Sequence, residues 1–137
     1  MLNYSLVHPP LLGALAAGHG SQVLLADGNY PAATARPAGA PVIHLNLRPG
    51  LLSVTDVLHP LLEAVNFEAA SVMALPDGGA VPAHDEYRQL LGEQVAFSVV
   101  ERFAFYEAAR GPDVAFVVAT GDQRICANLL LTIGVRT

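Results

Sequence analysis

Short apolar runs alternate with segments of helical spacing along the whole chain. A buried strand gives a short continuous apolar run, whereas a helix with one buried face repeats apolar residues three and four positions apart. This alternation is typical of the α/β class. The pattern predicts strands at residues 22–26, 42–47, 71–75, 95–100, 114–119 and 128–133, and helices at 11–16, 53–65, 83–91 and 102–109.

Turn and capping residues mark the boundaries of some of these elements. Asp27 opens an Asp-Gly-Asn turn immediately after residues 22–26, and these residue types favour turns. Asp27 should therefore lie at the carboxyl end of that strand, where ligands bind in open α/β sheets. Ser53 followed by Asp56 predicts a capping box at the start of helix 53–65.

The composition limits the domain count and the compartment. The 137 residues are 53% hydrophobic and 14% charged, which predicts one compact domain over residues 1–137. No apolar run approaches the roughly 20 residues that a membrane-spanning helix needs. Residues 1–12 lack the basic flank of a signal peptide, so we expect a cytoplasmic protein. Cys126 is the only cysteine, which excludes an internal disulfide and a multi-thiolate metal site.

The charge distribution argues against several classes of partner. A formal net charge of −5 without basic clusters disfavours nucleic acid and anionic membranes, because binding to phosphates depends on Lys and Arg. His8, His44, His59 and His84 share no metal-ligand spacing, so we expect no metal site. Residues 84–87 are interpreted as a polar helix start, more simply a capping region than a site, although they could border a pocket.

The strongest candidate for chemistry is His19, which lies between two glycines in the turn before strand 22–26. Its imidazole has an unperturbed pKa near neutrality and suits proton transfer at cellular pH. The strand spans roughly 15 Å, so His19 and Asp27 would share a pocket only if loops fold back or two subunits meet. The alternative is structural: His19 as a surface turn residue and Asp27 as a turn former.

Other candidates also have structural interpretations. Arg102 could pair with its neighbour Glu101, and the aromatic residues at 103, 105 and 106 are most simply a packing stripe on one helix. Cys126 lies among apolar residues, which predicts a small buried thiol with a raised pKa rather than a nucleophile.

Three segments, in order along the chain, resemble one family. They are GHGSQVLLADGNYP at residues 18–31, ERFAFYEAARGPDVAFVVATGD at 101–122 and ANLLLTIGV at 127–135. The first resembles the amino-terminal signature of the ribose pyranase and L-fucose mutarotase family (RbsD/FucU), and the other two are similar to its fucose mutarotase branch. A Gly-His-Gly triplet alone is a weak signal, but RFAFYE together with the other segments is specific.

The resemblance implies a Rossmann-like subunit with a mostly parallel sheet flanked by helices, and no cofactor. It also implies self-association into rings or stacked rings, of which a decamer is one form, with monosaccharide sites at subunit contacts. Residue by residue, it assigns the general acid/base to His19, a carboxylate that binds sugar hydroxyls to Asp27, a substrate contact to Arg102, and the asparagine of a terminal Tyr-Gly-Asn or Tyr-Ala-Asn motif to Asn128.

The chain departs from the family at Cys126, where a tyrosine is usual. A thiol neither stacks on a sugar face nor supplies a phenolic hydroxyl, so the substrate-binding role of this position and the identity of the sugar stay open. We expect a mutarotase that interconverts anomers of L-fucose or a related aldose by general acid/base ring opening. A D-ribose pyranase, a non-catalytic monosaccharide-binding or regulatory module and a purely structural ring former are the alternatives.

Overall fold

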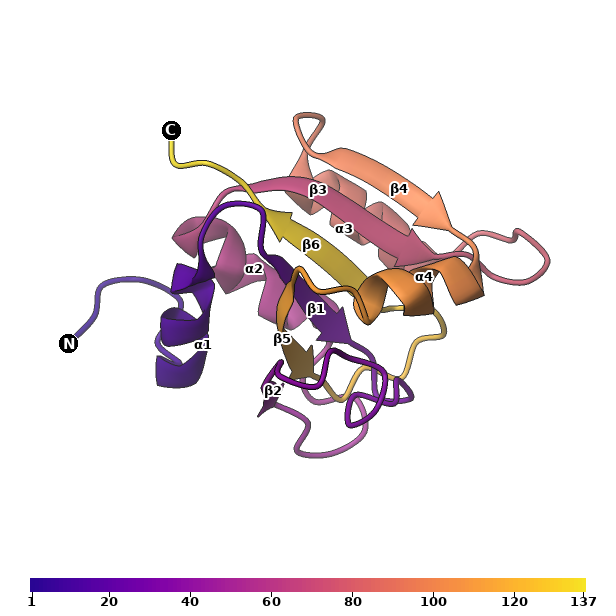
Figure 1. The fold of residues 1–137 in the computed structure, drawn as a ribbon, viewed down its shortest axis with the longest axis horizontal. Helices are drawn as coiled ribbons and strands as arrows, with labels where there is room; N and C mark the ends of the chain where they lie inside the picture. Colours follow the sequence, from indigo (N-terminus) through magenta and orange to yellow (C-terminus); the bar gives the residue numbers. More distant parts are fainter.

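The computed structural model describes residues 1–137, and its centre is a six-stranded sheet of order β2-β5-β1-β6-β3-β4 (Figure 1). The predicted α/β class is confirmed. The strands are β1 (Gln22–Ala26), β2 (Val42–His44), β3 (Phe67–Met73), β4 (Ala96–Val100), β5 (Val114–Ala119) and β6 (Leu129–Ile133). The helices are α1 (Pro9–Ala14), continued by a 3-10 turn at Leu15–Ala17, α2 (Val54–Ala64), α3 (Pro82–Leu91) and α4 (Arg102–Ala109).

All strands except β6 run in the same direction. β5 is parallel to β1 and β2, β3 is parallel to β4, and β6 is antiparallel to β1 on one side and β3 on the other. The mostly parallel, helix-flanked sheet that the resemblance implies is therefore confirmed. Because β6 is antiparallel to β1, the carboxyl end of β1 lies beside the amino end of β6.

Helices cover both faces of the sheet. One face packs against α1, α2 and α3, and its core includes Leu11, Leu58, Leu61 and Tyr87. The other face packs against α4 and the loop after β1, with Phe105 at its centre, and Figure 1 shows α4 in front of the sheet with α2 and α3 behind it. None of the helices has the length and apolar character required to cross a bilayer.

The predicted capping box at the start of α2 is confirmed. Ser53 Oγ accepts the Asp56 N–H at 3.0 Å, and an Asp56 carboxylate oxygen accepts the Ser53 N–H at 2.9 Å. Each bond satisfies a backbone donor that the first turn of a helix leaves without an internal partner. The sequence signal and the local structure agree because both depend only on residues close in the chain.

Strand boundaries differ where pairing overrides the local pattern. β3 begins at Phe67, four residues before the predicted start at 71, because it pairs on both sides and Phe67 lies opposite Ile133. β2 ends at His44 rather than residue 47, because it is an edge strand whose only partner, β5, ends opposite His44 at Ala119. Pairing with neighbouring strands therefore determines where β3 begins and where β2 ends.

Candidate active site

Asp27 and Asn128 meet where β1 ends and β6 begins. The Asp27 N–H donates to Asn128 Oδ1 at 2.7 Å, and the Asn29 N–H donates to Asp27 Oδ1 at 2.9 Å. The Asp27 side chain is only 6% exposed. Burial raises the pKa of this carboxyl above its ordinary value, although N–H groups of Asn29, Tyr30 and Ala127 oppose the shift. A buried, fixed carboxyl of this kind is suited to accept hydrogen bonds from ligand hydroxyls.

Most of the predicted site residues line one cavity of about 310 Å³. This volume lies at the small end of the range for small-molecule sites. The cavity brings together four predicted residues from different parts of the chain: Asp27 after β1, Arg102 at the start of α4, and Cys126 and Asn128 before β6. The fold thus brings together polar residues that lie up to about a hundred positions apart in the sequence.

Arg102 is directed to this cavity and does not pair with its neighbour. The Glu101 carboxylate caps α4 instead, accepting the N–H groups of Phe103 and Ala104. The Arg102 guanidinium lies 5.9 Å from the centroid of the Tyr106 ring, and it makes none of the ion pairs in the structure. Its N–H donors are therefore placed beside the cavity, where ligand oxygens could accept them.

Two tyrosines in the cavity wall were not predicted as site residues. Tyr30 and Tyr106 stack with ring centroids 5.4 Å apart, and both line the cavity. The predicted packing stripe on α4 is confirmed for Phe105 and for Tyr106, which packs against the same core cluster, and is wrong for Phe103, which is 75% exposed. Tyr106 also lines the cavity. Helical spacing alone does not distinguish a cavity wall from a core, but Tyr30, three positions after Asp27 in the same turn, offered a signal.

Cys126 lines the same cavity and is half-buried. Burial raises the pKa of its thiol, and the nearby Asp27 carboxylate adds to that shift. The pKa therefore shifts in the predicted direction, and a thiol with a raised pKa is protonated at neutral pH and a poor nucleophile. The predicted full burial is wrong, because the cavity exposes part of the side chain. No group of three His, Cys, Asp or Glu side chains gathers as a metal site would require.

His19 lies at the opposite end of β1 from Asp27. It precedes the amino end of β1, its side chain is 56% exposed, and its Nε2 donates to Glu68 Oε2 at 3.0 Å. The length of β1, roughly 15 Å, separates His19 from Asp27. A single chain therefore does not bring His19 into the cavity that holds the other predicted residues.

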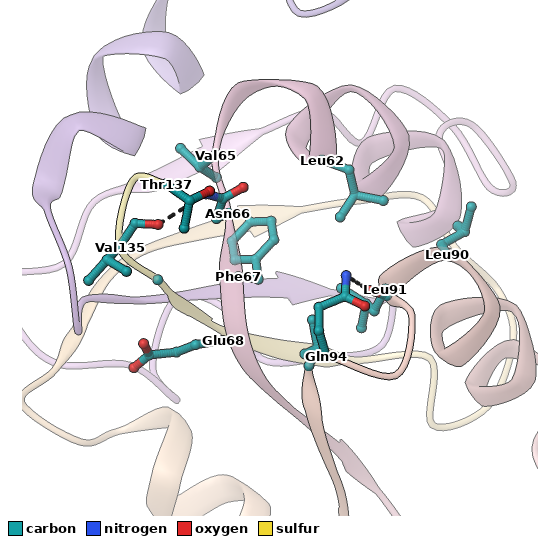
Figure 2. Close-up of a pocket in the computed structure, with 12 residues that line it drawn as sticks. Leu62, Val65, Asn66, Phe67, Glu68, Leu90, Leu91, Gln94, Val135 and Thr137 are labelled. Carbon is teal, nitrogen blue, oxygen red and sulfur yellow. Dashed lines mark hydrogen bonds between the residues drawn. The ribbon is translucent and has the colours of Figure 1, made fainter.

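A second hollow, of about 520 Å³, lies at the His19 edge and includes Glu68 in its wall (Figure 2). Figure 2 shows the Phe67 ring in the middle of the lining residues and the Glu68 carboxylate turned away from Leu62 and Leu91. The Asn66 amide donates to the Val135 carbonyl at 3.0 Å. The wall includes the polar side chains of Asn66, Glu68, Gln94 and Thr137 but none of the predicted residues Asp27, Arg102, Cys126 and Asn128.

The chain matches a family model over residues 1–136, and that model describes the RbsD / FucU transport protein family. The chain belongs to this family. It is 38% identical to the fucose mutarotase of Danio rerio, over 96% of this chain and 90% of the relative.

Solved structures of RbsD/FucU proteins share the fold. FucU from Bifidobacterium longum superposes with a TM-score of 0.80 at 32% identity, covering 96% of this chain and 97% of the other. The fucose mutarotase from Streptococcus pneumoniae in complex with L-fucose gives a TM-score of 0.81 at 25% identity, covering 96% and 95%. The chain therefore spans nearly the full length of these family members.

Proposed function

We propose that this chain is a mutarotase, an isomerase that interconverts the anomers of L-fucose or a related aldose without a cofactor. The 38% identity to a fucose mutarotase over nearly the whole chain carries the proposal. The cavity supports it, because carboxylate, guanidinium and amide groups surround two stacked tyrosines. Sugars need this combination of hydrogen-bonding groups and aromatic surface.

His19 is proposed as the general acid/base. Its neutral imidazole removes the proton of the anomeric hydroxyl, the bond from C1 to the ring oxygen breaks, and the ring oxygen takes a proton from water, after which the imidazolium returns its proton to the hydroxide left behind. The open-chain aldehyde then closes from its other face to give the other anomer. Because Nε2 donates to Glu68, the neutral ring has its lone pair on Nδ1, which is the atom proposed to take the proton. General acid/base catalysis contributes roughly 10²- to 10⁴-fold.

Sugar binding is assigned to the cavity. Asp27 is proposed to accept from sugar hydroxyls, while Arg102 and the Asn128 amide nitrogen donate to sugar oxygens. Tyr30 and Tyr106 provide an aromatic wall, which replaces the stacking surface missing at Cys126. On this assignment, we expect the cysteine at that position to be compatible with binding.

A complete site is proposed to need two copies of the chain, with His19 from one copy at the cavity of another. The separation of His19 and Asp27 across β1 supports this arrangement. Phe103 and Ile125, 75% and 70% exposed, lie beside the cavity residues Arg102 and Cys126 and offer apolar surface for a neighbour. We therefore propose a homo-oligomer, such as a decameric stack of rings, that acts in the cytoplasm.

The proposal is tested by saturation-difference proton NMR of anomer exchange. L-Fucose, D-ribose, D-galactose and L-rhamnose are compared with and without the protein at neutral pH. We expect faster exchange for L-fucose, or for an aldose of similar shape, and loss of that acceleration in folded His19→Ala. Exchange between pyranose and furanose forms of D-ribose alone would instead indicate a pyranase, and sugar contacts without faster exchange would indicate a binding module.

A further inference from the structure

Helix α3 holds the loop that carries two cavity residues. His84 Nε2 donates to the Cys126 carbonyl at 2.9 Å, and the Tyr87 hydroxyl donates to the Ala127 carbonyl at 2.7 Å. The expected capping role of residues 84–87 is wrong, because Val81 is the N-cap of α3 and no side chain caps that helix. Instead, two side chains of the helix bind consecutive carbonyls of the β5–β6 loop.

These bonds fix the two peptide groups that precede Asn128. The peptide between Cys126 and Ala127 has its carbonyl on His84, while its N–H faces the Asp27 carboxylate. The next peptide has its carbonyl on Tyr87. Asn128 then places its side chain against the Asp27 N–H. The orientation of both sugar-binding groups therefore follows from how these peptides are held.

The loop conformation needs such support. Cys126 has φ 58°, in the left-handed region that a residue with a Cβ seldom adopts. A residue in that region keeps its conformation only when surrounding contacts determine it. Ala127 is fully buried, so its carbonyl depends on a protein donor rather than water.

Both donors are buried and remain donors at neutral pH. Tyr87 is fully buried and His84 is 7% exposed. Burial raises the pKa of Tyr87 above its ordinary value, so its hydroxyl keeps its proton. Burial lowers the pKa of His84, so its ring is neutral and holds its proton on the Nε2 that donates.

We propose that His84 and Tyr87 are positioning residues for sugar binding, which hold the turn from Cys126 to Asn128 so that Asn128 and Asp27 face the cavity. The inference rests on the proposed mutarotase function. Neither residue is assigned a contact with the sugar or a part in proton transfer. Proton transfer is the role proposed for His19, at the other end of β1.

The first test is Tyr87→Phe, which removes the hydroxyl and keeps the buried ring. Losing one buried hydrogen bond to the loop should raise KM for L-fucose about tenfold, while kcat stays within about twofold because His19 is unaffected. Leu61→Val is the control: Leu61 is fully buried in α2 and lies outside the cavity. It should lower the melting temperature with KM unchanged.

His84 is tested by a pair of variants. His84→Leu removes the donor to the Cys126 carbonyl and should raise KM as Tyr87→Phe does. His84→Gln keeps an N–H donor and should recover part of the loss. A KM unchanged in both Tyr87→Phe and His84→Leu would overturn the proposal, and so would a fall in kcat that follows the melting temperature.

A readout without turnover separates this inference from the proposed function. Cys126 is the only cysteine and lies in the loop, so its alkylation by iodoacetamide reports how firmly the loop is held. Alkylation should be about tenfold faster in Tyr87→Phe than in the parent or Leu61→Val. Alkylation at the parent rate in both Tyr87→Phe and His84→Leu would overturn the positioning role. If the parent accelerates no sugar, the proposed function fails, whatever the alkylation rates.

Discussion

At the scale of single residues, Asp27 is held between Asn128, which accepts its backbone N–H, and the Asn29 N–H, which donates to its carboxylate. Asp27 was predicted at the carboxyl end of a strand from its turn chemistry, and the structure places it there. Asn128 and Arg102 were predicted only by resemblance, because no local pattern shows that they lie near Asp27. Tyr106 was missed because helical periodicity is the same for a cavity wall and a packed core.

The buried Asp27 carboxyl gives a pH prediction. Its pKa is raised by burial, so protonation begins at a higher pH than for an exposed aspartate. As pH falls through that raised pKa, the carboxylate acceptor is lost, and the Kd for L-fucose should increase. Asp27→Asn should have a raised Kd that no longer changes with pH in the acidic range. Measuring the Kd against pH for both proteins by NMR titration, which needs no turnover, checks this, and identical acidic profiles would contradict it.

At the scale of helices and strands, local sequence patterns predict where several elements begin and end. They do not show which strands pair with one another in the sheet. β1, β5 and α4 have their predicted bounds, because each has a continuous apolar run or a clear boundary residue. β3 was predicted too short, since Glu68 interrupts the apolar pattern while the ladder with β6 continues. No local pattern shows that β6 inserts between β1 and β3, although this creates the cavity.

The capping box of α2 gives a stability prediction. Ser53→Ala removes the acceptor of the Asp56 N–H and one half of the box. The unfolding free energy should fall by about 1 kcal/mol, as measured by urea denaturation. Ser53→Thr, which keeps a hydroxyl acceptor, should remain close to the parent. A loss in Ser53→Thr as large as in Ser53→Ala would show that the hydroxyl is not the stabilising group.

At the scale of the whole molecule, one chain keeps the proposed proton-transfer residue His19 apart from the cavity around Asp27. The cavity with Asp27 lies at one edge of the sheet, and the pair of His19 and Glu68 lies at the other. The length of the predicted strand already indicated that one subunit would separate His19 from Asp27. The proposed subunit contact was not predictable, because the exposed Phe103 was interpreted from the sequence as part of a packing stripe.

The apolar surface beside the cavity gives an assembly prediction. Phe103→Asp places a charge on a side chain that is 75% exposed, and burying it against a neighbour would be costly. We expect a smaller species in analytical ultracentrifugation and loss of L-fucose exchange, with helix content retained. Phe103→Leu keeps an apolar side chain and should assemble as the parent does. A full-size assembly in Phe103→Asp would exclude this surface as a subunit contact.

The most direct test of the account is complementation between two inactive variants. His19→Ala and Asp27→Asn chains are co-expressed and purified as mixed assemblies, and L-fucose anomer exchange is measured by saturation-difference NMR. If each site combines His19 from one copy with the cavity of another, equal random mixing leaves about a quarter of the sites intact. We expect that fraction of parental activity in mixed assemblies and almost none in either variant alone. Mixed assemblies as inactive as the separate variants, beside an active parent, would contradict the shared site.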